Sequence, residues 1–159
     1  MINADFLDFI CILNAKEVEY LIVGGYAVSF HGYPRYTGDL DIWIKVSEEN
    51  AIKMMSALND FGINVPNLSV ADFLRTDEMA GIFFGREPQR IDIINVVDGI
   101  NFEACYEQKE IFVYNDITIP YLNFEDLKIN KLSSGRAKDK ADIKELEKRK
   151  KKKDKPKKK

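Results

Sequence analysis

The segment Asp39–Ile44, with the sequence DLDIWI, places two aspartates two residues apart in a run of bulky apolar residues. This alternation predicts a β-strand, although aspartate is depleted in strands. Asp39 and Asp41 then share one face of the strand, about 6–7 Å apart, where two carboxylates repel each other by about 2–3 kcal/mol. A divalent cation that binds both carboxylates reverses the sign of this interaction. Mg²⁺ prefers such oxygen ligands and keeps open positions for water and phosphate.

The segment before the acid pair predicts a second binding feature. Leu21–Val23 is an apolar run that suits a buried strand, and Gly24 and Gly25 follow it at the start of a short helical pattern that ends near His31. A strand that enters a helix through glycines lets a phosphate approach the backbone N–H groups closely. A phosphate site beside a metal site is the layout of a phosphoryl-transfer site.

The order and spacing of these residues resemble a known signature. Gly24 and Gly25, a spacer of thirteen residues, and the Asp39–Ile42 acid-apolar-acid-apolar pattern are similar to the motif of the DNA polymerase beta-like nucleotidyltransferase superfamily. The resemblance implies a third carboxylate on a neighbouring strand. Asp92 in the segment RIDII is its candidate, and we expect its strand to lie beside Asp39–Ile44.

The resemblance also implies roles for two residues that precede the acid pair. Similar nucleotidyltransferases often carry an arginine and a threonine or serine there, and Arg35 and Thr37 hold these positions. Arg35 is expected to grip a triphosphate with two parallel hydrogen bonds, together with Gly24, Gly25 and Thr37. The alternative is an exposed loop in which Arg35 and Thr37 contact only water.

A second resemblance covers residues 127–146, with the sequence LKINKLSSGRAKDKADIKEL. Small uncharacterised nucleotidyltransferases, including the AbiEii-toxin-like group, end in a similar stretch. The resemblance implies that two C-terminal helices close over the nucleotide and that Lys131 and Arg136 neutralise phosphate charge. The alternative is a linker between two helices whose charged side chains are solvated.

The charge distribution divides the chain into two parts. The net charge of the 159 residues is −2. Residues 148–159 hold ten basic residues and Asp154, a charge of +9, so residues 1–147 carry −11. We expect one nucleotidyltransferase domain over residues 1–147 and a disordered, lysine-rich tail over residues 148–159. The tail is expected either to solubilise the protein or to contact nucleic acid as an electrostatic arm.

Hydrophobic periodicity predicts a mixed α/β (α+β) fold with a small twisted sheet backed by helices. Further strands are expected at Phe61–Val65, at 82–84 hairpinned to 90–97, and at 111–114 and 117–121. Cys11 and Cys105 lack metal-site or CxxC spacing, and we expect both to be small core residues.

Together these patterns predict a minimal Mg²⁺-dependent nucleotidyltransferase that moves a nucleoside monophosphate from an NTP to an acceptor. Asp39, Asp41 and Asp92 are expected to be catalytic and to bind two Mg²⁺ ions. The acceptor is open: transfer RNA or another RNA, a protein hydroxyl of a toxin–antitoxin partner, or a small molecule. The alternative is a non-catalytic nucleic-acid-binding or toxin–antitoxin module that retains the fold. No segment suits a signal peptide or a membrane span, so a cytoplasmic location is expected.

Overall fold

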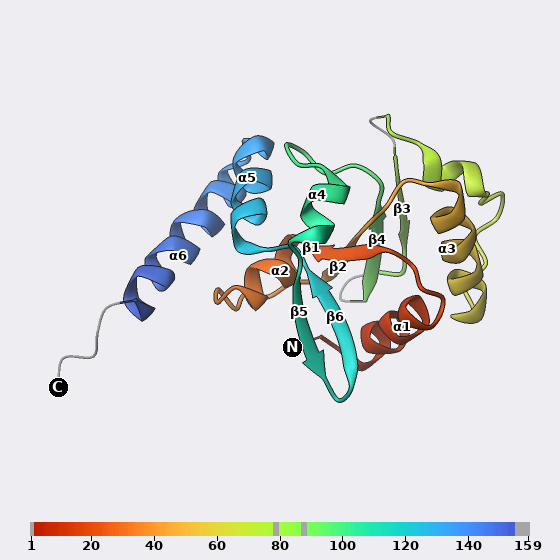
Figure 1. The fold of residues 1–159 in the computed structure, drawn as a ribbon, viewed down its shortest axis with the longest axis horizontal. Helices are drawn as coiled ribbons and strands as arrows, with labels where there is room; N and C mark the ends of the chain where they lie inside the picture. Colours follow the sequence, from red (N-terminus) through yellow and green to blue (C-terminus); the bar gives the residue numbers. More distant parts are fainter. Residues whose placement is uncertain (1, 78–79, 87–88, 155–159) are drawn as a thin grey trace.

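The computed structural model describes residues 2–77, 80–86 and 89–154, which form a mixed sheet with helices on both faces (Figure 1). The sheet has six strands in the order β3-β4-β2-β1-β6-β5. The β2–β4 and β1–β6 pairs are parallel, and the other neighbours are antiparallel. The strands are β1 (Tyr20–Val23), β2 (Asp39–Ile44), β3 (Gly81–Phe84), β4 (Arg90–Ile94), β5 (Glu110–Tyr114) and β6 (Ile117–Tyr121).

The described residues also form six α-helices and one 3₁₀ helix. Asparagine or serine side chains cap α1, α3, α4 and α5, each accepting a hydrogen bond from a backbone N–H in the first turn. Such caps satisfy N–H groups that have no partner inside the helix. The helices are α1 (Ala4–Ala15), α2 (Gly24–Phe30), α3 (Glu48–Asp60), the 3₁₀ helix η1 (Val70–Leu74), α4 (Phe102–Glu107), α5 (Phe124–Ser134) and α6 (Ala137–Lys153).

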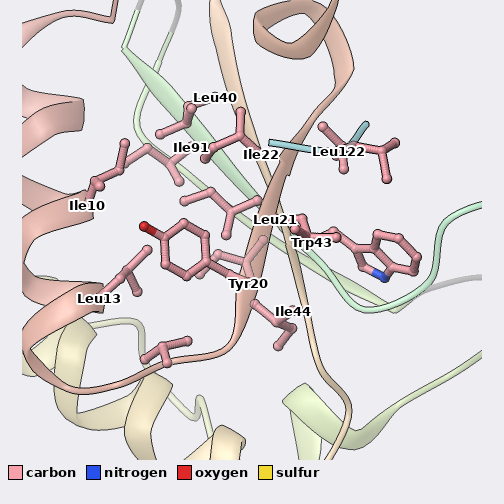
Figure 2. Close-up of a cluster of buried hydrophobic side chains, with 14 of the residues drawn as sticks. Ile10, Leu13, Tyr20, Leu21, Ile22, Leu40, Trp43, Ile44, Ile91 and Leu122 are labelled. Atoms are coloured by element: carbon pink, nitrogen blue, oxygen red, sulfur yellow. The ribbon is translucent and has the colours of Figure 1, made fainter. Parts of the chain in front are cut away.

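The strand registers divide the central sheet into an apolar face and a face that carries the acids. Ile42 on β2 pairs with Ile22 on β1 and with Ile93 on β4, and all three are fully buried. Helix α1 covers this face, where Tyr20 donates a hydrogen bond of 2.8 Å to Asn14 (Figure 2). Because side chains alternate along a strand, Asp39, Asp41 and Asp92 lie on the opposite face.

Two predictions about local structure are wrong. Phe61–Val65 is not a strand, because the end of α3 turns there: Gly62 has φ +83°, and Ile63 N–H donates to Leu58 O, which closes the helix. Cys11 is exposed, whereas Cys105 is buried as expected. The buried stripe of α1, which includes Phe6 and Ile10, leaves Cys11 on the opposite side of the helix.

The C-terminal segment continues as a helix into the lysine-rich region. Helix α6 runs through Lys153 and extends away from the sheet (Figure 1). Arg149 lies over the Tyr33 ring, 5.2 Å from its centroid, and donates a hydrogen bond to Gly32 O. Residues 148–153 of the tail, which we expected to be disordered, are therefore helical. The domain boundary at 147/148 remains a prediction, and residues 155–159 lie outside the described part. Within that part, no helix has the length and apolar character that a membrane crossing needs.

Candidate active site

The parallel pairing of β2 with β4 brings the three predicted catalytic acids together. Asp41 lies directly opposite Asp92, and Asp39 lies opposite Arg90, in the register of the two strands. Asp92 is 5% exposed. Neighbouring strands in a sheet are about 4.8 Å apart, so the structure gathers the three carboxylates on one face. The strand of Asp92 lies beside Asp39–Ile44, as the resemblance implied.

Arg90 lies among these carboxylates. Its Nη2 donates hydrogen bonds of 2.8 Å to Asp39 Oδ2 and to Asp92 Oδ2, and its Nε donates one of 2.8 Å to Asp92 Oδ1. A planar guanidinium suits such two-point binding of a carboxylate. Arg90 therefore supplies one positive charge to Asp39 and Asp92 and joins β2 to β4 across the candidate site.

The pKa of the Asp41 carboxyl is strongly raised. Burial raises its pKa to about 7, and the negative charges of Asp92 and Asp39 act in the same direction. The positive charges of Lys131 and Arg90 lower the pKa but do not offset the increase. Near neutral pH the Asp41 carboxyl therefore keeps its proton more readily than a free aspartate does. A bound cation would stabilise the ionised form of the Asp41 carboxyl at this site.

Gly24 places the end of β1 directly against Asp41. A Cβ atom built on Gly24 would lie 2.0 Å from Asp41 Oδ2, and the residue has φ +64°, where side chains are strained. The positive φ and the nearby Asp41 side chain therefore require a glycine at this position, whether or not a ligand is bound. The absence of a Cβ atom at Gly24 leaves room for the Asp41 carboxylate beside the first turn of α2.

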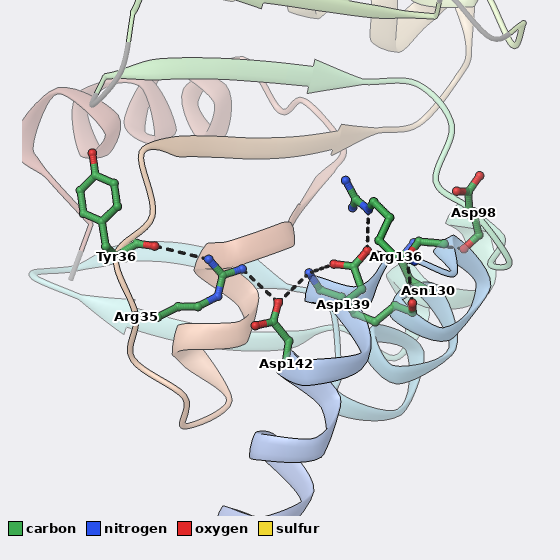
Figure 3. A network of polar contacts seen from close by, with 9 residues as sticks. Arg35, Tyr36, Asp98, Asn130, Arg136, Asp139 and Asp142 are labelled. Atoms are coloured by element: carbon green, nitrogen blue, oxygen red, sulfur yellow. Dashed lines mark hydrogen bonds and ion pairs between the residues drawn. The ribbon is translucent and has the colours of Figure 1, made fainter.

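The predicted phosphate-binding residues from the C-terminal stretch form a buried ionic network (Figure 3). Lys131 Nζ donates to Asp139 Oδ1 at 2.9 Å and to Asp142 Oδ2 at 3.3 Å. Arg35 Nη2 reaches the same Asp142 oxygen at 3.0 Å, and Arg136 Nε donates to Asp139 Oδ2 at 2.7 Å. The network ties the loop before β2 to helices α5 and α6.

The network differs from a set of solvated linker charges. Lys131, Asp139 and Asp142 are each at most 5% exposed, whereas the Arg136 side chain is 75% exposed. Burial alone raises the pKa of Asp139, but hydrogen bonds from Ser134, Lys131 and Arg136 outweigh it and hold that pKa at about 2. Lys131 also lowers the pKa of Asp41, so its positive charge acts on the carboxylate site.

The donor set fits a hard divalent cation, but the present side-chain positions bind Arg90 instead. Three carboxylates from two adjacent strands are the oxygen ligands that Mg²⁺ takes in phosphoryl-transfer sites. Among the described residues, no group of three or more His, Cys, Asp or Glu side chains is arranged to hold a metal ion. In the present arrangement the Arg90 guanidinium contacts Asp39 and Asp92.

Comparison with known protein families identifies the family of this chain. Residues 8–151 match the family described as "Nucleotidyltransferase of unknown function (DUF6036)". The chain belongs to this nucleotidyltransferase family. A search of curated proteins gave no match.

A solved structure supports the fold of this nucleotidyltransferase. It is a crystal structure at 1.87 Å resolution from Thermotoga maritima, described as that of a candidate nucleotidyltransferase. The two chains share 15% identity with a TM-score of 0.62, and the match covers 91% of this chain and 94% of the other. At that identity the likeness concerns the fold, which is the mixed α/β fold predicted from the sequence.

Arg90 is the site residue of this nucleotidyltransferase that the sequence analysis missed. The pattern Arg90-Ile91-Asp92 contains the signal, because residues i and i+2 of a strand lie on the same face. The parallel register that puts Asp39 opposite Arg90 cannot be read from local sequence. The sequence therefore predicted three acids without the cation that holds two of them.

Gly25 in the nucleotidyltransferase motif is needed for packing against Thr37. A Cβ atom at Gly25 would lie 2.7 Å from both Thr37 Cγ2 and Thr37 Oγ1. We expect Gly25→Ala to lower the free energy of unfolding by about 1–3 kcal/mol through overpacking, measured by urea denaturation. Thr37→Ala removes both clashing atoms, so the double mutant should regain part of this loss. Additive effects of the two substitutions would contradict this packing role.

Proposed function

We propose that this protein transfers a nucleoside monophosphate from an NTP to an acceptor hydroxyl or phosphate, with release of pyrophosphate. The observation that carries the proposal is the register of β2 with β4, in which Asp41 lies opposite Asp92, and Asp39 lies on the same face. The chain that carries these acids belongs to a nucleotidyltransferase family. Three carboxylates that converge beside a glycine turn are suited to binding a nucleoside triphosphate together with its divalent cations.

In this proposal, Asp39, Asp41 and Asp92 hold two Mg²⁺ ions. Bound divalent cations supply positive charge to the phosphate oxygens as the bond to pyrophosphate breaks. Asp92, on the interior strand β4, orients the acceptor and takes its proton as the acceptor oxygen bonds to the α-phosphorus. Gly24 leaves the space that the Asp41 carboxylate occupies, and the pairing of β2 with β4 places the carboxylates before substrate arrives.

Basic side chains around the carboxylates are proposed to bind the triphosphate. Gly24, Gly25 and Thr37 line its approach, and Lys131 contributes charge that already reaches Asp41. Arg35 is bonded to Asp142 and Arg136 to Asp139, so both are held at the junction of the β2 loop with α6. Each retains further N–H groups for phosphate, because a guanidinium carries five donors.

The decisive experiment follows the label from two forms of ATP. Purified protein is incubated with Mg²⁺, with either a cell extract or transfer RNA, and with ATP labelled at the α- or the γ-phosphate. The other three NTPs are then tested in separate incubations. Transfer of the α label to an RNA, a protein or a small molecule, with the γ label in pyrophosphate, is the expected result. Transfer of the γ label to the acceptor would instead indicate a kinase, and no transfer from any NTP would remove the enzymatic proposal.

A nucleic-acid-binding role is the second candidate, and the exposed lysines of α6 favour it. Lys148, Lys151 and Lys152 lie with Lys144 and one carboxylate, Glu147, around a shallow depression on this helix. The helix extends away from an acidic body (Figure 1). Lysines placed in this way on a protruding helix suit a phosphate backbone. In this candidate the acceptor of the enzyme is RNA, or the protein binds RNA without catalysis.

Neutralising Lys148, Lys151 and Lys152 with glutamine tests this candidate. If each lysine contacts a phosphate, binding of transfer RNA should lose about 0.7–0.9 in its log–log salt slope per residue, measured by fluorescence anisotropy at several salt concentrations. A matched variant replaces Lys16, Lys45 and Lys53, which form ion pairs elsewhere, and should keep the wild-type slope. Equal slopes in both variants would exclude α6 as the RNA-binding element.

A further inference from the structure

Phe83 on β3 is an exposed aromatic residue in the row of strand positions that contains two of the candidate acids. It lies opposite Asp92 in the antiparallel pairing of β3 with β4, and Asp92 lies opposite Asp41. Directly opposed residues of neighbouring strands point to the same face of a sheet. The Phe83 side chain therefore lies on the acid face, where it is 63% exposed. An exposed ring contributes little to folding, but at this position it adds a flat apolar surface to the candidate site.

Two neighbours set the position of the Phe83 ring. A Cβ atom built on Gly81 would lie 3.2 Å from Phe83 Cζ, so the missing side chain at Gly81 leaves room for the ring on this face. The Arg90 guanidinium lies over the ring, 5.9 Å from its centroid, and the same guanidinium binds Asp92. With both contacts in place the ring is still mostly exposed, so it can receive a further planar group beside the carboxylates.

The order of positions across the sheet determines from which side an acceptor enters. From β1 to β3 the row consists of Val23, Asp41, Asp92 and Phe83, and Gly24 follows Val23 in the chain. In the proposed function the triphosphate lies at the glycine end of this row. The attacking and leaving oxygens of a transferred phosphoryl group lie roughly in line. Because pyrophosphate leaves toward the glycine turn, the acceptor oxygen approaches from the end that carries Asp92 and Phe83.

We propose that Phe83 selects the acceptor, and that the acceptor hydroxyl belongs to a nucleoside whose base stacks on the Phe83 ring. This inference rests on the proposed function and names the chemical class of its acceptor. The nucleoside oxygen bonds to the α-phosphorus as the bond to pyrophosphate breaks, and Asp92 takes the proton. Stacking on an aromatic ring accepts any base, because every base has a π-face.

The spacing of Asp92 and Phe83 favours a nucleoside over other acceptors. Neighbouring strands are about 4.8 Å apart, so a hydroxyl at Asp92 and a ring stacked at Phe83 are separated by about this distance. A ribose separates its 3′-hydroxyl from the base, whereas tyrosine carries the hydroxyl on the ring itself, and serine and threonine have no ring. A polycationic antibiotic would bring its positive charges to the Arg90 guanidinium, which repels them.

Tryptophan fluorescence of Phe83→Trp tests the stacking without catalysis. The single tryptophan of the chain, Trp43, is 2% exposed, so the wild-type protein serves as the blank. A non-hydrolysable ATP analogue and Mg²⁺ are bound first, and adenosine or a trinucleotide of RNA is then added. We expect quenching by both, but none by a trinucleotide with an abasic 3′ end. Tighter binding of the trinucleotide identifies an RNA end as the source of the nucleoside, and equal binding identifies a free nucleoside.

Three results of the fluorescence experiment would overturn the proposal. Quenching by the ATP analogue alone, with no further effect of adenosine or RNA, would assign Phe83 to the base of the NTP. Equal quenching by the abasic trinucleotide would show that no base stacks on the ring. No quenching by any of these ligands would show that Phe83 lies outside the binding site.

Kinetics of Phe83 variants test the selection of the acceptor. Phe83→Ala should raise the KM for the acceptor about 5–150-fold, the range for one stacked base, and leave the KM for the NTP unchanged. Phe83→Tyr keeps an aromatic ring and should stay near the wild type, whereas Phe83→Leu keeps only an apolar side chain and should not. Phe112→Ala is the matched control, because Phe112 is 44% exposed on β5, which β1 and β6 separate from the acids.

The same variants separate a failure of this inference from a failure of the proposed function. If no label is transferred, the proposed function fails, and the dissociation constant of the RNA trinucleotide, measured by fluorescence anisotropy, still compares the variants. Weaker binding by Phe83→Ala and Phe83→Leu alone would support stacking at Phe83. Equal binding by all variants, or a rise in the KM for the NTP alone, would overturn it.

Discussion

Asp41→Asn is expected to abolish Mg²⁺-dependent NTP binding and, in the metal-free protein at pH 8, to raise the midpoint of thermal unfolding by about 5 °C or more. The loss of binding follows because Asp41 is the central acid of the three, opposite Asp92 and two residues from Asp39. Removal of a direct ligand should exceed the 10–100-fold loss in metal affinity typical of residues that only support a ligand. Isothermal titration calorimetry with and without Mg²⁺ measures this effect.

The gain in stability follows from the pKa of Asp41. In the folded protein that pKa is about 7, mainly because of burial and then because of Asp92 and Asp39, against a reference value of 3.8. Between these two values the folded state binds the proton and the unfolded state does not, so stability falls as the pH rises from about 4 to about 7. The difference corresponds to about 2–4 kcal/mol above pH 7. The asparagine side chain of the variant cannot ionise, so this part of the pH dependence should disappear.

Asp98→Asn is the matched control for this prediction. Asp98 is exposed and lies outside the carboxylate cluster, at the turn after β4 (Figure 3). Its replacement should change neither NTP binding nor the pH dependence of the melting temperature. If Asp41→Asn binds Mg²⁺ and NTP like the wild type, the metal-site assignment fails. If only its stability is unchanged, the electrostatic account of Asp41 fails.

Arg90→Gln is expected to have opposite effects on the metal-free and the Mg²⁺-bound protein. Without metal, loss of the guanidinium leaves Asp39 and Asp92 without the charge that now joins them. Breaking a buried ion pair costs about 3–5 kcal/mol, but the Arg90 side chain is 37% exposed, so we expect a loss of about 1–3 kcal/mol. In the presence of Mg²⁺, the same variant has no guanidinium that competes with the metal for the Asp39 and Asp92 oxygens, so we expect it to bind Mg²⁺ more tightly.

The measurement is the melting temperature of both proteins across a Mg²⁺ titration. The midpoint of the Mg²⁺ effect should move at least tenfold lower in Arg90→Gln, equivalent to about 1.4 kcal/mol of added binding energy. Arg75→Gln serves as control, because Arg75 forms an exposed ion pair with Asp77 and its replacement should leave the stability nearly unchanged. An unchanged Mg²⁺ midpoint in Arg90→Gln would show that Arg90 does not occupy the metal position.

The elements that local sequence predicted well are those in which one pattern decides the structure. The alternation in DLDIWI predicted strand β2 and its acid face, and the strands expected at 82–84, 111–114 and 117–121 correspond to β3, β5 and β6. Local patterns failed where a helix end competed with a strand signal, as at Phe61–Val65, and where residue type outweighed helical position, as at Cys11.

By itself the sequence determined the acid pair, the glycine turn before it and the mixed α/β class, because strand and helix periodicities and turn residues act over a few positions. Only the tertiary structure decided which strands became neighbours. The parallel register of β2 with β4 put Arg90 between Asp39 and Asp92, and the packing of α5 and α6 placed Lys131 with Asp139 and Asp142. Partners so far apart in the chain meet through packing and hydrogen bonding of the whole sheet, which no local pattern encodes.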